Sequence, residues 1–227
     1  MRTRPYLLLV GATICLGLTL DTSLPIWGQT LTNVLTFSVF AYVLIKSTAE
    51  EARILLICTV LALAGEIFLC FGWGLYTYRL GNLPWFVPPG HALLFFAGYK
   101  LSQTVPRWFP RLVTVLALLT VSTQVFAFGY TSELLWIGLY LFFHALDRER
   151  TIYSVMLVLA LGLELIGTYL GAWVWAEEVR FFGLSSMNPP LMAGAFYCVL
   201  DYLVLSTDRL LPKGIFWQFR NAEEVKK

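Results

Sequence analysis

Charged residues are scarce in this sequence of 227 residues, and the basic ones form no block. Only 13% are Asp, Glu, Lys or Arg, whereas 58% are hydrophobic and the mean hydropathy is +0.72. A soluble domain carries roughly a quarter charged residues. The small net charge of +2 and the lack of any basic block argue against a nucleic-acid partner. So much apolar surface predicts an integral membrane protein.

Residues that could bind a metal ion or act as a catalytic nucleophile are also few. The four cysteines fall in or at the ends of apolar runs without metal-ligand spacing, so we expect neither a disulfide nor a metal site. The sequence has no Ser/His/Asp arrangement, no HExxH run and no phosphate-binding glycine loop. We therefore expect no cofactor, because nucleotide and haem chemistry have no support.

Eight apolar segments predict an all-α fold, a polytopic membrane helix bundle. Each is about long enough to cross a hydrocarbon core of ~30 Å when tilt is allowed. The first segment lacks a small-x-small cleavage site and leads directly into the second, so we expect a retained helix and not a signal peptide. The predicted transmembrane segments are 6–20, 30–46, 53–72, 88–104, 110–128, 132–146, 152–172 and 189–206.

The basic residues predict how these spans are oriented. With a cytoplasmic N-terminus, all but two of the 16 lysines and arginines fall in cytoplasmic segments, and only Arg79 and Arg180 lie outside. This asymmetry follows the positive-inside rule. It predicts a multi-pass protein of the cell membrane with both termini in the cytoplasm and 211–227 as a short tail. The connection 73–91 is then extracytoplasmic.

The two halves of the chain share a pattern of rare residues. LALAGEIFLCFGWGLYTYRLGNLPWFVPPG and LALGLELIGTYLGAWVWAEEVRFFGLSSMNPPL each contain a glutamate, a glycine, two aromatics spaced by one residue, and a Pro-Pro pair that we expect to open the next span. Coincidence between two apolar hairpins is the alternative. The matched residues are Glu66 and Glu164, Gly74 and Gly171, Tyr76-x-Tyr78 and Trp173-x-Trp175, and Pro88-Pro89 and Pro189-Pro190.

We interpret this pattern as an internal repeat within a single membrane domain, 1–227. The repeats cover about 1–105 and 106–210, with four predicted spans in each. An even number of spans keeps both repeats in the same orientation. They should therefore be parallel repeats, related by a pseudo-two-fold axis along the membrane normal.

Glu66 and Glu164 are the first candidate catalytic residues. Each lies about thirteen residues past the cytoplasmic end of its helix, which at ~1.5 Å per residue places both at similar depth in the outer half of the membrane. A carboxylate inside a membrane costs several kcal/mol unless it is paired or hydrated, and by default it marks a functional site. The alternative is a structural pair that is hydrogen-bonded to neighbouring helices or loop ends.

Histidine and two further charged residues complete the polar candidates. His91 follows VPPG on the same outer side, where it is either a third catalytic residue or a cap, and His144 is expected at the cytoplasmic interface. Lys100 and Asp201 each lie eleven residues after a Pro-Pro pair. They should pair between the halves, although snorkelling explains Lys100 equally well.

Aromatic residues are concentrated in the two outer connections. Tyr and Trp gather at membrane interfaces in any case, but two Trp-rich loops that each follow a buried Glu would also line a pocket for an apolar ligand. Their π faces would stabilise a cationic intermediate. The candidate substrate-binding residues are Trp73, Tyr76, Tyr78, Trp85, Trp173, Trp175 and Asn188.

At these residues the chain resembles two families of carotenoid biosynthesis. ELIGTYLGAWVW is similar to the Glu-Gly-Gly-aromatic pattern of the carotenoid-hydratase membrane family, and GLYTY with FVPPG resembles the repeated domain of small, multi-span lycopene cyclases. Where the cyclase repeat has acidic residues directly after the proline, this chain has Gly90-His91 and Leu191-Met192. The resemblance implies protonation of a polyene inside the bilayer, with Glu164, and through the repeat Glu66, at the acidic position.

Two hypotheses of different classes follow. The first is a membrane enzyme, a hydratase, lyase or isomerase, in which a neutral carboxylic acid protonates a double bond of an isoprenoid, carotenoid or other lipid. The second is a carrier or binding protein in which the two repeats enclose a lipid-like ligand. A homo-oligomer or a subunit that docks a membrane partner protein is a further alternative.

Overall fold

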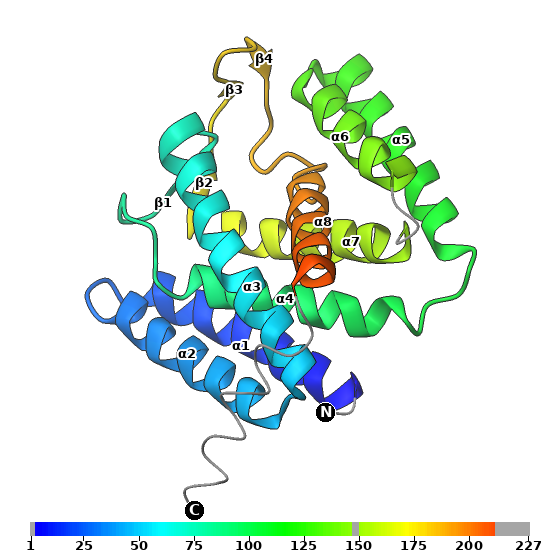
Figure 1. The fold of residues 1–227 in the computed structure, drawn as a ribbon. Helices are drawn as coiled ribbons and strands as arrows, with labels where there is room; N and C mark the ends of the chain where they lie inside the picture. Colours follow the sequence, from blue (N-terminus) through cyan, green and yellow to red (C-terminus); the bar gives the residue numbers. More distant parts are fainter. Residues whose placement is uncertain (1–2, 147–149, 212–227) are drawn as a thin grey trace, which may run out of the picture.

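The computed structural model describes residues 3–146 and 150–211, and the described chain is almost entirely helical (Figure 1). A π-helical turn, η1 (Ile67–Trp73), extends the third α-helix, and four short strands lie in the two long connections. The α-helices are α1 (Thr3–Ser23), α2 (Gly28–Lys46), α3 (Ala49–Glu66), α4 (Val87–Ser102), α5 (Phe109–Phe128), α6 (Ser132–Leu146), α7 (Arg150–Tyr169) and α8 (Ala195–Leu210). The strands are β1 (Tyr76–Tyr78), β2 (Trp173–Trp175), β3 (Glu178–Val179) and β4 (Leu184–Ser185).

Five helices of the described chain are long and apolar enough to cross a membrane. They are α1, α2, α3 with η1, α5 and α7. Helices α4 and α8 have 16 residues each and α6 has 15, so at 1.5 Å per residue they reach less than the ~30 Å of a hydrocarbon core. The composition and these helices agree with a multi-pass membrane protein, while the count of eight spans stays a prediction.

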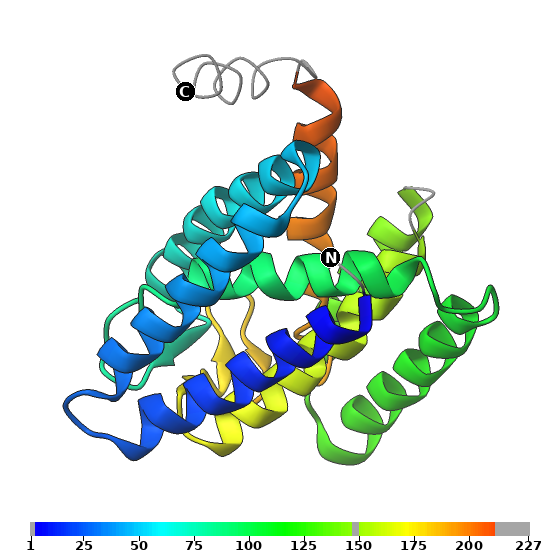
Figure 2. The same ribbon diagram turned by 90° about the horizontal axis from the view of Figure 1, so that it is seen from below.

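Helix α4 runs through the middle of the fold. It packs against α1, α2, α3 and α7, and Figure 2 shows it crossing the middle of the molecule. Its residues from Ala92 to Gly98 are all buried. This central position explains why a helix of only 16 residues carries so continuous an apolar run.

The contacts of the two halves correspond in part. Helix α3 packs against α4 and α8, and α7 packs against α8 and α4. The hairpins α1–α2 and α5–α6 also occupy corresponding places in the chain, but α1 lies against α4 whereas α5 lies against α7. The hairpin α5–α6 stands at one end of the molecule in both views (Figures 1 and 2).

Both connections leave their helices through a left-handed glycine. After η1, Gly74 has φ 74°, and after α7, Gly171 also has φ 74°. Glycine adopts this conformation without the steric cost that other residues meet. The amide N–H of Leu75 then donates to the carbonyl of Leu69 at 3.0 Å, and that of Ala172 to the carbonyl of Gly167 at 2.8 Å. The chain thereby turns back over the helix that it has just left.

The two connections meet as an antiparallel ribbon of β1 and β2. Tyr76 lies opposite Trp175, Thr77 opposite Val174, and Tyr78 opposite Trp173. The first aromatic of one strand therefore faces the second aromatic of the other, which is the pairing that a two-fold axis through the central pair would produce. A second short ribbon, β3–β4, follows in the same connection as β2.

The Pro-Pro pairs do not act alike, which corrects one prediction. Pro88 and Pro89 lie in the first turn of α4, as expected. Helix α8 begins only at Ala195, so Pro189-Pro190 does not open it. The turn between this Pro-Pro pair and α8 is held by α6. The carboxylate of Glu133 on α6 accepts hydrogen bonds from the amide N–H groups of Leu191 and Met192 at 2.6 and 3.0 Å.

The expected pairing of Lys100 with Asp201 is also wrong. The ammonium of Lys100 lies 2.9 Å from Glu51 Oε1, because the last turn of α4 packs beside the first turn of α3. Arg53, in the second turn of α3, forms an ion pair with Asp208 of α8 at 2.6 Å. Asp201 is fully buried, and neither of its carboxylate oxygens has a hydrogen-bond partner within the described part of the chain.

Candidate functional site

A cavity of about 510 Å³ lies beneath the β1–β2 ribbon, and its wall is mostly apolar. Helices of both halves line it, together with the ribbon itself. Both candidate glutamates and His91 are on this wall. Pockets of ~300–1,000 Å³ that combine an apolar lining with a few polar groups are typical ligand sites. The cavity is therefore the candidate site of this protein.

Glu66, the last residue of α3, is held by two phenols. Tyr76 and Tyr78 lie two residues apart on β1, so both rings face inward while Thr77 is exposed. Their hydroxyls donate to the same carboxylate oxygen, Oε2, at 2.8 and 2.6 Å. Burial and the nearby carboxylate raise the pKa of both phenols, so both remain protonated donors. Two charge-assisted hydrogen bonds thus compensate a buried carboxylate.

Glu164, in the last turns of α7, is held in the same way by two indoles. Trp173 and Trp175 alternate on β2 as the tyrosines do on β1. Their Nε1–H groups donate to Glu164 Oε2 at 2.8 and 2.9 Å. The ribbon therefore presents four inward donors to two carboxylates, one pair from each half of the chain.

Gly167 makes the contact between Trp173 and Glu164 possible. It lies nearly one helical turn after Glu164, and a Cβ atom added there would overlap the indole ring of Trp173. A residue with a side chain would displace the ring that donates to the carboxylate. The glycine thus serves close packing at this position, since its helical backbone does not require it.

His91, in the first turns of α4, lies beside the other oxygen of Glu66. Its Nε2 is 3.3 Å from Glu66 Oε1, and its Nδ1 donates to the carbonyl of Val87 at 3.0 Å. Because Nδ1 donates to a carbonyl, Nε2 is the ring nitrogen that faces the carboxylate of Glu66. The imidazole also stacks on Tyr197, with 5.1 Å between ring centroids and 4° between planes.

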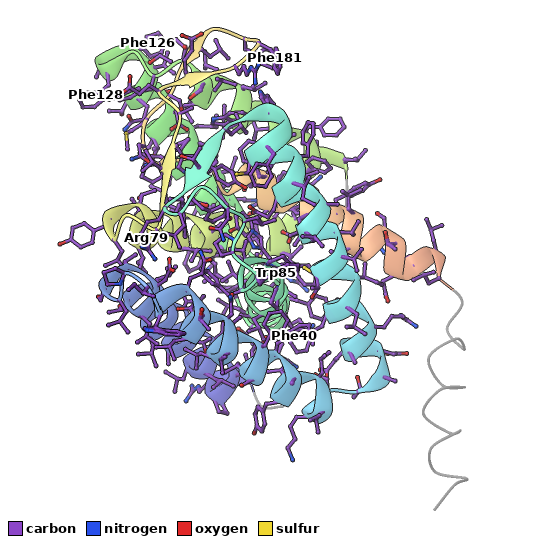
Figure 3. The ribbon with its side chains drawn as sticks, turned by 90° about the vertical axis from the view of Figure 1, so that its left-hand side faces the viewer. Phe40, Arg79, Trp85, Phe126, Phe128 and Phe181 are labelled. Carbon is purple, nitrogen blue, oxygen red and sulfur yellow. The ribbon has the colours of Figure 1, made fainter. Side chains whose placement is uncertain are left out.

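Three predicted residues do not form part of the inner wall in the expected way. Trp85 is 69% exposed and absent from the cavity lining (Figure 3). Asn188 does not line the cavity either; its Oδ1 accepts the amide N–H of Trp175 at 3.0 Å and so positions β2. Trp73 does line it, but from η1, where its Nε1 donates to the carbonyl of Arg180 at 3.0 Å.

Sequence reasoning missed several residues of the wall. Tyr197 and Phe196 of α8 and Trp136 of α6 line the cavity. Phe196 packs on Trp136, with ring centroids 4.6 Å apart, and on Trp175 at 6.1 Å. Tyr197 and Phe196 lie outside the repeated motif, so the comparison of the halves had no signal for them. Glu133 stands out in the sequence as an acid within an apolar run, but in the structure it binds the backbone amides that precede α8.

Within residues 3–146 and 150–211 there is no group of three or more His, Cys, Asp or Glu side chains that could hold a metal ion. Glu66 and His91 are two ligands at most, and Glu164 is bound by indoles. All four cysteines are free thiols. The groups that the described arrangement brings together on the cavity wall are two carboxylates, an imidazole and aromatic rings.

Comparisons with known proteins add no family to this geometry. No family model matches the chain, and neither the curated proteins nor the solved structures contain a match to it. The resemblance to carotenoid hydratases and lycopene cyclases thus rests on the short motifs alone.

Proposed function

We propose that this protein is an integral membrane enzyme that protonates a double bond of an isoprenoid, carotenoid or similar apolar lipid. The observation that carries the proposal is the Glu66–His91 pair, 3.3 Å apart, on the wall of an aromatic-lined cavity that also contains Glu164. An acid and a second carboxylate in one apolar cavity are the parts that general acid–base catalysis requires. A soluble polar substrate would find few partners on such a wall.

The proton shared by Glu66 and His91 is the one transferred in this mechanism. It forms a C–H bond at one carbon of the alkene, and the π electrons leave the other carbon as a cation. The faces of Trp173, Trp175 and Tyr197 can stabilise that cation. Glu164 then accepts a proton, either from the carbon next to the cation, which gives an isomer, or from a water that adds to it, which gives an alcohol.

We also propose that the chain crosses the cell membrane eight times, as two parallel repeats with both termini in the cytoplasm. The crosswise pairing of β1 with β2 supports a pseudo-two-fold axis through the ribbon. The matched contacts of α3 with α8 and of α7 with α4 support the same axis. The site would then lie in the outer half of the membrane, with the ribbon as its lid.

The test is a pigment assay in a bacterial host that accumulates an acyclic polyene. Wild-type protein should yield a product that is heavier by one water, or an isomer of equal mass with a changed retention time. Glu66→Gln and Glu164→Gln should each lower its yield by roughly 10²-fold or more. Glu178→Gln, an exposed glutamate of β3, is the matched control and should leave the yield unchanged.

Two results would contradict the proposal that this protein is an enzyme. If both cavity variants keep the wild-type yield at equal expression, neither carboxylate is catalytic. If purified wild-type protein retains a lipid that mass spectrometry finds unaltered, and no product forms with it, the protein is a carrier or binding protein.

A further inference from the structure

Asp201 is the one carboxylate of the described chain that is fully buried and has no hydrogen-bond partner at either oxygen. Buried polar groups are almost always paired, so such a group needs an explanation. An isolated ionised carboxylate in an apolar interior costs so much that the group binds a proton instead. The site assigned above does not use Asp201.

Among the described residues, none supplies a counter-charge to Asp201. The titratable groups that interact with it are the thiols of Cys58 on α3 and Cys198 on α8 and the phenol of Tyr197. None of the ion pairs among the described residues includes it. A metal ion is equally unsupported, because two thiols and one carboxylate in this region do not form a metal-binding group. A proton is the ligand that fits.

Several charged or titratable groups on the helices packed against α8 have partners of their own. On α3, Arg53 pairs with Asp208. On α6, Glu133 binds the amides that precede α8, and His144 packs on Tyr140 at 5.4 Å between centroids. On α7, Glu164 binds its two indoles, and the Tyr153 ring packs on Phe143 at 6.3 Å between centroids.

Tyr197 connects Asp201 to the cavity. It lies four residues before Asp201 on α8, a spacing that places two side chains on the same helix face with ~5–6 Å between their Cβ atoms. Its ring stacks on His91 and lines the cavity, and it interacts electrostatically with Glu164 and Glu66 as well as with Asp201.

Resting on the function proposed above, we propose that Asp201 is a neutral acid that stores the proton with which the Glu66–His91 pair is reprotonated, and that Tyr197 relays it. The Asp201 O–H bond breaks and its proton passes to the oxygen of Tyr197, one helical turn away, while the Tyr197 O–H proton moves to the pair. Asp201 later regains the proton that Glu164 accepted from the substrate or water, by the same phenol. No electrons are transferred, and each turnover returns every acid to its starting state.

The first experiment does not depend on activity. Infrared spectra of the purified full-length protein at neutral pH are compared with those of Asp201→Asn. The difference should contain the C=O band of a protonated carboxylic acid, which the variant lacks. If wild type instead shows only a carboxylate band that the variant lacks, Asp201 is ionised and the inference is wrong.

The second experiment measures the pH profile of turnover in the pigment assay. Asp201→Asn should lower the rate by about 10²-fold at pH 8 and by much less at pH 6, where protons from solvent replace the store. Asp201→Glu should restore most of the rate. Tyr197→Phe should reproduce the loss, and the double variant should lose no more than either single variant, because both act in one relay.

The outcomes separate this inference from the proposed function. If Glu66→Gln abolishes product while Asp201→Asn keeps the wild-type rate at both pH values, the proton store is wrong and the enzyme stands. An equal loss at both pH values in Asp201→Asn, or additive losses in the double variant, also overturns the store, because a merely structural role predicts them. If Glu66→Gln has no effect, the proposed function fails whatever Asp201 does.

Discussion

At the scale of single residues, the two cavity carboxylates have equivalent positions but different donors. An indole N–H can only donate, whereas a phenol hydroxyl can also accept. Because the indoles of Trp173 and Trp175 can only donate, Glu164 Oε2 must accept both hydrogen bonds whether or not the carboxyl group carries a proton. The phenols of Tyr76 and Tyr78 leave Glu66 able to gain or lose a proton without losing its partners. This asymmetry matches the proposed roles of Glu66 as proton donor and Glu164 as proton acceptor.

The packing of Gly167 against Trp173 gives the first prediction. Gly167→Ala should displace the indole and lower the free energy of unfolding by about 1–3 kcal/mol, as overpacking does. Gly162→Ala is the control on the same helix, since a Cβ atom there meets nothing within 4 Å. That variant should be neutral or more stable by up to ~1 kcal/mol. Thermal unfolding in detergent measures both, and equal melting temperatures would contradict the contact.

The phenol donors give the second prediction. Tyr76→Phe and Tyr78→Phe should each destabilise the protein by about 1–3 kcal/mol, because a buried carboxylate loses one hydrogen bond without gaining another. Tyr169→Phe removes a hydroxyl from a ring that is 90% exposed and should have no effect. Urea or thermal titration of the three variants tests this. A Tyr78→Phe variant as stable as wild type would mean that Glu66 is satisfied by other groups.

At the scale of elements, the ends of α3 and α7 decide where the site lies. Each helix carries its glutamate near the end, turns through a left-handed glycine and returns as a strand of three residues. A strand this short positions two side chains on one face, and an isolated ribbon is only marginally stable. The stability of β1–β2 therefore comes from the four buried rings and their bonds to the glutamates. Arg79 anchors the end of β1, because its Nη2 lies 3.1 Å from Asp21 Oδ1 of α1.

The register of the ribbon gives the third prediction. Thr77 and Val174 are directly opposite and both exposed. In a background without the native cysteines, Thr77→Cys with Val174→Cys should form a disulfide on mild oxidation, because opposed strand residues have Cα atoms ~4.5–5.5 Å apart. Peptide mass spectrometry detects the cross-link, and the two single variants are the controls. Failure to cross-link would show that the two connections do not pair in this register.

At the scale of the whole molecule, the two halves of the chain make some contacts that correspond and others that do not. The central helices α3, α4, α7 and α8 contact one another in a matched way, whereas α5 does not take the place that α1 has against α4. Large exposed aromatics, Phe126, Phe128 and Phe181, gather at the end formed by the α5 terminus and the β3–β4 connection (Figure 3). Aromatic side chains of this kind suit a membrane–water interface, which agrees with an outer position of the ribbon.

The orientation in the membrane gives the fourth prediction. In a cysteine-free background, Asn82→Cys and Tyr130→Cys should react from outside intact cells with an impermeant thiol reagent, whereas Thr48→Cys should react only after the membrane is opened. Asn82 and Thr48 lie in connections at opposite ends of α3 with η1. Labelling of position 48 from outside would contradict the proposed orientation, and protection of position 130 would contradict the count of spans.

Much of the local arrangement follows from the sequence by itself. Its composition indicates a helical membrane protein, because 58% of the residues are hydrophobic and so large an apolar surface is more stable in lipid than in water. The spacing of Tyr76 with Tyr78 and of Trp173 with Trp175 already places each pair on one side of an extended segment. The corresponding positions of Glu66 and Glu164 along their helices follow from counting residues. These properties depend on neighbours in the chain, which a sequence shows directly.

Only the tertiary structure decided which of these groups meet. The pairing of β1 with β2, the approach of His91 to Glu66 and the outward position of Trp85 depend on how separate helices pack, and residue spacing does not encode that packing. For the same reason Lys100 binds Glu51 of the adjacent α3, where the repeat had suggested Asp201. Within the described residues Asp201 is left buried without a hydrogen-bond partner. The groups that interact with it are the Cys58 thiol of α3 and the Cys198 thiol and Tyr197 phenol of α8 itself, and none of these is a cation.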